Sequence, residues 1–190
     1  MDTIKPSDFS AGLMANLAGA AAKAGISPTD FDRLWRNKKK MLALASMLHG
    51  DDIDCAGTPF IPSGLEYKDE DQIKSAYRGT LKAGKIFSSM YLDERQKVGV
   101  LIGETLKLAL EGKLVLTAHC LDFVLRPENQ HLIPDELKGK ALFFWGSIYR
   151  NSRGVLCVRC LYWHDDQWGS NVSWLGSGWN ASSPAAMLEG

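Results

Sequence analysis

Five of the chain's six tryptophans fall within residues 140–179, KALFFWGSIYRNSRGVLCVRCLYWHDDQWGSNVSWLGSGW. Three runs rich in aromatic and branched residues lie in this stretch, at residues 141–150, 155–164 and 167–175. The connection at 151–154, Asn-Ser-Arg-Gly, suits a hairpin loop in which Gly154 takes a positive φ, and Asp-Asp at 165–166 suits a two-residue turn. The stretch therefore predicts a three-stranded antiparallel β-meander.

Alternation along these strands puts apolar side chains on both faces of the meander, if Arg150 lies opposite Val155 and His164 opposite Gln167. One predicted face carries Leu142, Phe144, Ile148, Val155, Cys157, Leu161, Trp163, Trp168, Val172 and Trp174. The other carries Phe143, Trp145, Tyr149, Leu156, Val158, Cys160 and Tyr162. An antiparallel sheet with one face in water alternates apolar with polar residues, so both faces of this one need a cover.

Two explanations fit these apolar faces. The aromatic side chains can all belong to the core, where their large apolar area stabilises a small domain. Alternatively, one face stays open and binds a ligand, a protein partner or a second copy of the chain. In that case Trp145, Tyr149 and Tyr162 are the candidate partner-binding or ligand-binding residues.

The rest of the chain shows apolar residues at helical spacing. We expect helices at residues 9–24, 28–48, 69–82, 93–110 and 118–125. The sequence as a whole predicts an α+β fold, in which a mainly helical N-terminal two-thirds packs on the C-terminal three-stranded antiparallel β-meander. Residues 51–66, rich in proline and glycine, predict a loop or linker between a helical hairpin unit at 1–50 and residues 67–190, the two packing as one compact domain.

The first helix pair, within residues 9–48, resembles the helix-turn-helix of DNA-binding regulators. Ala21 is followed four residues later by Gly25, and Phe31 and Leu34 follow the glycine by six and nine residues. The resemblance implies a DNA-binding set made of Thr29, Arg33, Arg36, Asn37, Lys38, Lys39 and Lys40. A plain helical hairpin explains the same pattern, because small residues and a glycine corner also serve packing.

Charge and hydropathy restrict the partners. Lys plus Arg and Asp plus Glu both total 22, so the net charge of zero does not favour a nucleic-acid partner. The N-terminus lacks the basic and apolar regions of a secretory signal, and no apolar run approaches membrane-spanning length. We therefore expect a cytoplasmic protein with no membrane partner.

The cysteines invite a metal or redox interpretation, which geometry opposes. Cys157 and Cys160 form a C-x-x-C pair, but residues three apart in a strand point to opposite faces and cannot hold one ion without a bulge. His119 and Cys120 are neighbours on a predicted helix, about 100° apart around its axis. We expect no catalytic residue, metal site or cofactor, and keep a small metalloprotein or Cys-dependent enzyme as an alternative.

Residues 117–187 contain the runs LRPENQHLIPDELKGKALFFWGSIYR, GVLCVRCLYW and SSPAAM. This combination resembles the C-terminal Trp-rich module of small uncharacterised bacterial proteins, in which a short helix and an LIP…KGK run precede the meander. The resemblance implies no activity, substrate or cofactor. We expect a non-enzymatic binding or regulatory protein that contacts DNA through residues 9–48, or a protein-protein or self-association module, such as a homodimer, that uses the aromatic face.

Overall fold

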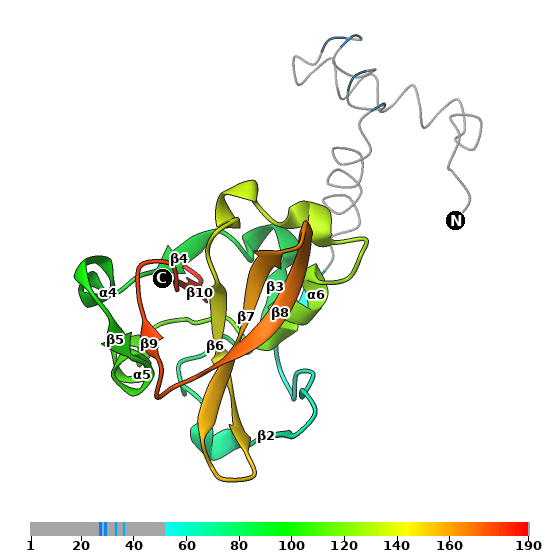
Figure 1. The fold of residues 1–190 in the computed structure, drawn as a ribbon. Helices are drawn as coiled ribbons and strands as arrows, with labels where there is room; N and C mark the ends of the chain where they lie inside the picture. Colours follow the sequence, from blue (N-terminus) through cyan, green and yellow to red (C-terminus); the bar gives the residue numbers. More distant parts are fainter. Residues whose placement is uncertain (1–26, 28, 30–32, 34–35, 37–51, 190) are drawn as a thin grey trace. The chain divides into compact units, whose positions relative to one another are not determined.

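The computed structural model describes residues 27, 29, 33, 36 and 52–189. The chain divides into two compact units, Met1–Ala45 and Ser46–Gly190. In the second unit, residues 52–189 are built around a twisted mixed β-sheet (Figure 1). In the first unit, the described Thr29, Arg33 and Arg36 are helical.

The central sheet has the strand order β4-β10-β6-β7-β8. These strands are β4 (Ser89–Tyr91), β10 (Ala185–Met187), β6 (Leu142–Asn151), β7 (Leu156–His164) and β8 (Gln167–Trp174). The strand β2 (Leu65–Tyr67) also pairs with β6, near its C-terminal end. The β10–β6 pairing is parallel and the other pairings of this sheet are antiparallel. The three predicted meander strands are confirmed as β6, β7 and β8.

The two turns of the meander follow the residue types that form them. Gly154 has a φ of 80°, and Asp165 and Asp166 have φ of 48° and 58°. Two successive positive φ values define the type I′ turn, whose twist matches that of the strands it joins. The turn sets His164 opposite Gln167, as predicted, and the β7–β8 register then continues without a shift to Cys157 and Trp174.

The predicted pairing of Arg150 with Val155 is wrong, because Arg150 lies opposite Leu156. Strict alternation is wrong for two residues of β6, because the β6–β7 register shifts between Phe143 and Ile148. The shift moves Ile148 to the side of Phe143 and Tyr149 to the opposite side, the reverse of the prediction. Four residues of β6, 144–147, stand opposite the single residue Arg159 of β7, and an odd number of extra residues reverses every side chain beyond them. Gly146 lies within this irregular stretch, and its amide donates to the carbonyl of Leu116 at 2.9 Å.

The predicted mainly helical N-terminal two-thirds is wrong. The α-helices of residues 52–189 are α4 (Glu94–Val98), α5 (Gly103–Leu110) and α6 (Ala118–Val124). Strands also fill this part of the chain, namely β1 (Asp52–Asp54), β2, β3 (Thr80–Lys82), β4 and β5 (Leu101–Ile102). The described unit is thus a sheet with short helices beside it, not a set of helices packed on a meander.

The helix predicted for residues 93–110 is broken in the middle. Asp93 does cap its start: the carboxylate accepts from the Arg95 amide, and the Gln96 side chain accepts from the Asp93 amide. The sequence Gly-Val-Leu-Ile-Gly at 99–103 then leaves the helix, and β5 pairs with β9 (Gly178–Trp179). Glycine and β-branched residues weaken a helix, so pairing with β9 prevails over the helical spacing.

The helix predicted for residues 69–82 is also absent. This segment forms the 3₁₀ turn η2 (Asp69–Asp71) and then β3, which pairs with β1 so that Ile53 lies opposite Leu81. Both side chains are buried in the core. Three more 3₁₀ turns follow, η3 (Ala83–Lys85), η4 (Gln130–Leu132) and η5 (Asp135–Leu137). Tertiary pairing has overridden the local spacing here as well.

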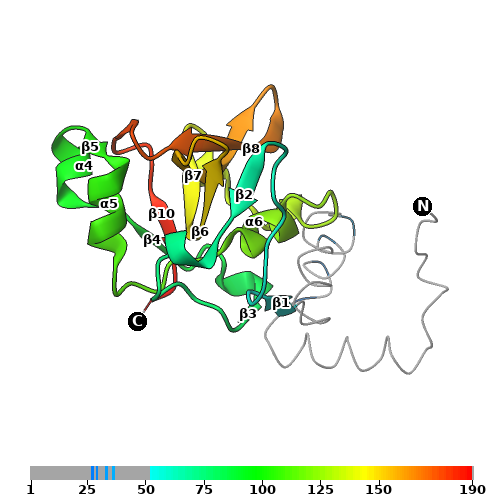
Figure 2. The same ribbon diagram turned by 90° about the horizontal axis from the view of Figure 1, so that it is seen from below.

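The sheet separates two hydrophobic clusters, so the chain itself covers both faces. The first cluster includes side chains of β1, β3 and α6 together with Leu142, Phe144 and Leu161. The second includes Leu106 and Leu110 of α5, β9 and the opposite face of β6. Figure 2 shows α6, β1 and β3 on one side and α4, α5 and β5 on the other.

Candidate functional site

The aromatic residues proposed to bind a partner lie mostly in the core. Trp145 and Tyr149 are fully buried and Tyr162 is half-buried. The Trp145 ring packs against Trp179, with ring centroids 4.8 Å apart. The Tyr149 hydroxyl donates to the carbonyl of Phe60 at 3.2 Å. Trp145 and Tyr149 are therefore occupied by contacts within the subunit.

The described residues show no clear helix-turn-helix, which corrects that prediction. Of the DNA-binding set, Thr29, Arg33 and Arg36 are helical and exposed. The remaining members, Asn37, Lys38, Lys39 and Lys40, lie outside the described residues, as does most of the 9–48 pair. The described part of the chain therefore gives no geometry for DNA contact.

Cys157 and Cys160 lie on opposite faces of β7, as the spacing predicts. Cys157 belongs to the first hydrophobic cluster and Cys160 to the second. Burial raises the pKa of each thiol to about 11. Within residues 52–189, no group of three or more His, Cys, Asp or Glu side chains is arranged to hold a metal ion.

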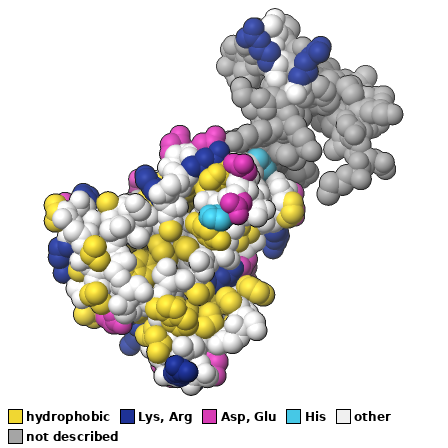
Figure 3. Space-filling view, in the orientation of Figure 1, with side chains coloured by type: hydrophobic (Ala, Val, Ile, Leu, Met, Phe, Trp, Pro, Cys, Tyr) yellow, Lys and Arg dark blue, Asp and Glu magenta, His cyan; other side chains and the backbone are white. Residues whose placement is uncertain are grey.

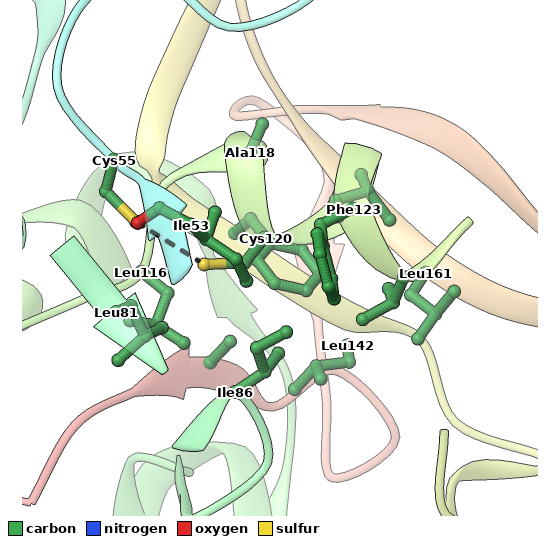
Figure 4. Packing of buried hydrophobic residues seen from close by; sticks show 14 of the residues in the cluster. Ile53, Cys55, Leu81, Ile86, Leu116, Ala118, Cys120, Phe123, Leu142 and Leu161 are labelled. Atoms are coloured by element: carbon green, nitrogen blue, oxygen red, sulfur yellow. Dashed lines mark hydrogen bonds between the residues drawn. The ribbon is translucent and has the colours of Figure 1, made fainter. Parts of the chain in front are cut away.

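A different cysteine pair was not foreseen. The Sγ atoms of Cys55, after β1, and Cys120, in α6, lie 3.7 Å apart in the core (Figure 4). The hydrogen bond to Cys55 and burial both raise the pKa of Cys120, and accepting this bond lowers the pKa of Cys55. Both side chains are fully buried, so neither thiol is open to a substrate.

His119 does not serve as the base for either thiol. Its Nδ1 atom lies 3.0 Å from Oγ1 of Thr117, and burial lowers the pKa of the imidazole. A nucleophile of the Cys–His type requires a hydrogen bond between thiol and imidazole. His119 is bonded to a hydroxyl instead, and the predicted adjacency to Cys120 leads to no catalytic pair.

A buried arginine organises the loop between β1 and β2. Arg159 of β7 is 3% exposed, and its Nη1 atom donates to Oδ1 of Asp122 at 2.7 Å. Oδ2 of Asp122 accepts from the amide of Phe60 at 3.1 Å, and the guanidinium lies 5.2 Å from the centroid of the Phe60 ring. Strand, helix and loop are thereby joined, and Phe60 is held at the surface with 63% of its area exposed.

A cleft of about 530 Å³ lies beside this network, between α6 and the loop that carries Phe60. Its carboxylates already have partners. Asp52 pairs with Lys82 at 2.5 Å, Oδ1 of Asp54 accepts from the Ala56 amide at 2.9 Å, and Asp122 pairs with Arg159. The carboxylates of the cleft therefore support the fold rather than forming an acid-base pair for catalysis.

The outer edge of β8 is a further exposed feature of the described residues. Among the described strands, β8 pairs only with β7 and ends the sheet. Leu175, directly after the strand, donates to the Leu156 carbonyl, so the odd-numbered residues of β8 face β7. The backbone groups of Trp168, Ser170, Val172 and Trp174 therefore point away from β7, and the Trp174 carbonyl accepts from the Ser177 amide at 2.9 Å. The amide of Val172 donates to Oδ1 of its neighbour Asn171 at 2.8 Å.

This edge lacks the devices that usually block strand pairing. Exposed edges are commonly protected by lysine, proline, a bulge or short length. The strand β8 runs for eight residues, QWGSNVSW, without charge or proline, and its pairing with β7 has no bulge. The opposite end of the sheet, β4, has only three residues. Length and composition distinguish the β8 edge as able to accept another strand.

The apolar side of β8 continues toward the surface. Trp168, Val172 and Trp174 share the face of the first hydrophobic cluster, with Trp168 and Val172 half-buried and Trp174 37% exposed. Val155, at the neighbouring end of the β6–β7 hairpin, is also exposed. Figure 3 shows hydrophobic side chains gathered over the lower part of the molecule, where the hairpin and β8 lie.

The chain matches no protein-family model, no curated protein and no solved structure. The resemblance of residues 117–187 to the Trp-rich module of uncharacterised bacterial proteins therefore stays a prediction. Among the described residues, no helix is long and apolar enough to cross a membrane. The geometry of the sheet carries the functional argument that follows.

Proposed function

We propose that residues 52–189 form a protein-binding module that accepts an extended segment at the outer edge of β8. Strand addition supplies affinity through backbone hydrogen bonds and specificity through alternate side chains. The observation that carries this proposal is the eight-residue uncharged edge, whose even-numbered backbone groups point away from β7.

The neighbouring side chains support the same function. Trp168, Val172 and Trp174 offer apolar contacts on one face, where alternate residues of an added strand would lie. Tryptophan contributes large contact area at small cost in side-chain entropy, which favours it at binding surfaces. The ion pair between the buried Arg159 and the half-buried Asp122 joins the sheet behind this edge to α6.

A strand-addition assay tests the proposal directly. The probe is a fluorescent peptide with the sequence of residues 166–176, DQWGSNVSWLG, titrated into dilute full-length protein and followed by anisotropy. We expect saturable binding that exceeds that of a scrambled peptide. Equal binding of both peptides would contradict the proposal, because side-chain alternation would then have no role.

Two variants at one position separate edge pairing from other effects. Ser170→Pro removes an outward amide and leaves the backbone bonds to β7 in place, because the Ser170 amide does not donate toward β7. It also removes the Ser170 hydroxyl, which accepts from Arg159 of β7 at 3.4 Å, and Ser170→Ala removes the same hydroxyl. Ser170→Ala keeps that amide and serves as the matched control. We expect the proline variant to lose peptide binding and the alanine variant to keep it.

A further inference from the structure

We infer that the strand accepted by β8 is the β8 strand of a second copy of this chain, paired antiparallel about a two-fold axis at Asn171. This inference rests on the proposed function and names its partner. In such an isologous contact, each residue of one copy meets the residue related to it by the axis in the other. The sequence of β8 is suited to this relationship.

The apolar face of β8 is nearly symmetric about Asn171. Trp168 and Trp174 lie three residues before and after it, and Ser170 and Val172 one residue before and after. Antiparallel pairing centred on Asn171 therefore sets Trp168 of each copy opposite Trp174 of the other. The backbone agrees with this register, because the amide and carbonyl of Trp168 and the amide of Trp174 point outward. The Trp174 carbonyl also accepts from the Ser177 amide at 2.9 Å within the subunit. Aromatic pairs across neighbouring strands stabilise a sheet.

Charge also favours this arrangement. The β7–β8 turn carries the exposed Asp165 and Asp166, and the β6–β7 turn at the other end of the strands carries the exposed Arg153. Antiparallel pairing brings the acidic turn of one copy to the end of the sheet that carries Arg153 in the other. The two acidic turns lie at opposite ends of the paired strands, so like charges stay apart.

Asn171 has a defined role in the separate subunit. Its side-chain oxygen accepts the outward amide of Val172, the donor that would otherwise face the partner strand. On pairing, that amide donates to the Ser170 carbonyl of the second copy, and the Asn171 side chain is released beside its symmetry mate. The contact thus replaces one local hydrogen bond with a backbone ladder between copies.

The register gives a sharp test with engineered cysteines. Asn171 faces β7 with its backbone, so the Asn171 pair across the axis is of the non-hydrogen-bonded type, with Cα atoms about 4.5 Å apart. That separation lies within the range of a disulfide. Ser173 of one copy faces Gly169 of the other, and the two Ser173 residues are roughly 14 Å apart along the strand. Ser173→Cys is therefore the matched control for Asn171→Cys.

The experiment oxidises each full-length variant with oxidised glutathione and measures the initial rate of dimer formation on a non-reducing gel. The four native thiols are buried and the unmodified chain provides the background. We expect Asn171→Cys to crosslink at least about tenfold faster than Ser173→Cys, because only the first pair can reach disulfide geometry. Comparable rates for the two variants would overturn the assigned register and with it the inference.

Sedimentation of the full-length chain over a range of concentrations gives an independent readout. Ser170→Pro removes two hydrogen bonds between the copies, one from each by symmetry. We therefore expect the dimer dissociation constant of Ser170→Pro to be at least about tenfold larger than that of Ser170→Ala. A dimer unaffected by Ser170→Pro would use another surface and would overturn the inference. A third outcome separates the two proposals: the chain stays monomeric and does not crosslink at position 171, yet it binds the 166–176 peptide. This outcome would leave the proposed function in place and would refute a second copy of the chain as the partner.

Discussion

Arg159 and Asp122 form an ion pair in which Nη1 of the arginine lies 2.7 Å from Oδ1 of the aspartate, with their side chains 3% and 26% exposed. The pair joins the centre of β7 to α6, and through Asp122 it also holds the Phe60 amide. The sheet and the loop over it therefore depend on one buried charge and its partner.

Removing the aspartate leaves the arginine buried without its partner, which is strongly unfavourable. We expect Asp122→Ala to lower the free energy of unfolding by about 3 kcal/mol. The double variant Asp122→Ala with Arg159→Met should recover most of this loss, since no unpaired charge remains. Urea denaturation of both variants checks the prediction, and a single-variant loss below about 0.5 kcal/mol, typical of an exposed pair, would contradict it.

His119 gives a prediction for the pH dependence of stability. Burial is the largest influence and lowers its pKa below the ordinary value of 6.5, against the opposing effects of Asp122 and Asp54 and with a smaller contribution from Arg78. The unfolded chain therefore binds a proton at this site at a higher pH than the folded chain. Stability from this group is fully present above pH 6.5 and is lost as the pH falls toward the folded pKa.

The variant His119→Gln tests this contribution. We expect the fall in unfolding free energy between pH 7 and pH 5 to be smaller in the variant than in the unmodified chain, because glutamine takes up no proton. Urea midpoints at pH 5, 6, 7 and 8 give the comparison. An identical pH dependence of both proteins would show that His119 titrates alike in the folded and unfolded states.

The thiols give a prediction for chemical reactivity. All four cysteines are buried, and burial raises the pKa of Cys157 and Cys160 to about 11. The thiolate is the reactive form. We expect no fast reaction with Ellman's reagent in the native protein at pH 8, and reaction of all four thiols in denaturant. Rapid native labelling of one thiol would identify an accessible nucleophile and support the enzyme alternative.

Gly146 gives a prediction about packing at the irregular point of β6. A Cβ atom there would lie 2.7 Å from the Leu116 carbonyl oxygen and 2.9 Å from the Thr117 amide nitrogen, both backbone atoms that cannot easily move. We expect Gly146→Ala to cost about 3 kcal/mol, as in overpacked cores. Gly154→Ala is the comparison, since its Cβ would meet nothing within 4 Å and the cost is only that of its positive φ, about 1 kcal/mol. Equal thermal stability of the two variants would refute this account.

The sequence predicts the meander because its turns and strands are formed by residues that are neighbours in the sequence. Residues 151–154 and 165–166 form the turns, and the two-residue turn sets the pairing of His164 with Gln167. The register shift between Phe143 and Ile148 lies where the backbone of residues 116–117 approaches Gly146, a contact that no local pattern contains. The same holds for β1 with β3 and for β5 with β9, where partners distant in sequence replace expected helices.

The candidate site likewise combines features that the sequence predicts with features that depend on the tertiary structure. The strand β8 and its tryptophans are evident from composition, but the status of β8 as the last strand depends on the sheet order. Arg159 and Asp122 are 37 residues apart, and Cys55 and Cys120 are 65 residues apart. A single sequence does not indicate that two residues so far apart are in contact, so these contacts could be found only in the structure.

Amide hydrogen exchange along β8, measured by NMR with full-length protein at increasing concentration, tests the central claim most directly. The inward amides of Gly169, Asn171 and Ser173 should be protected at every concentration. The outward amides of Trp168, Ser170 and Trp174 should exchange fast in dilute solution and become protected as the concentration rises, because the edge then pairs. Either of two results would contradict strand addition at β8. In the first, the outward amides are already protected in dilute protein. In the second, they exchange fast at every concentration, both with and without the 166–176 peptide.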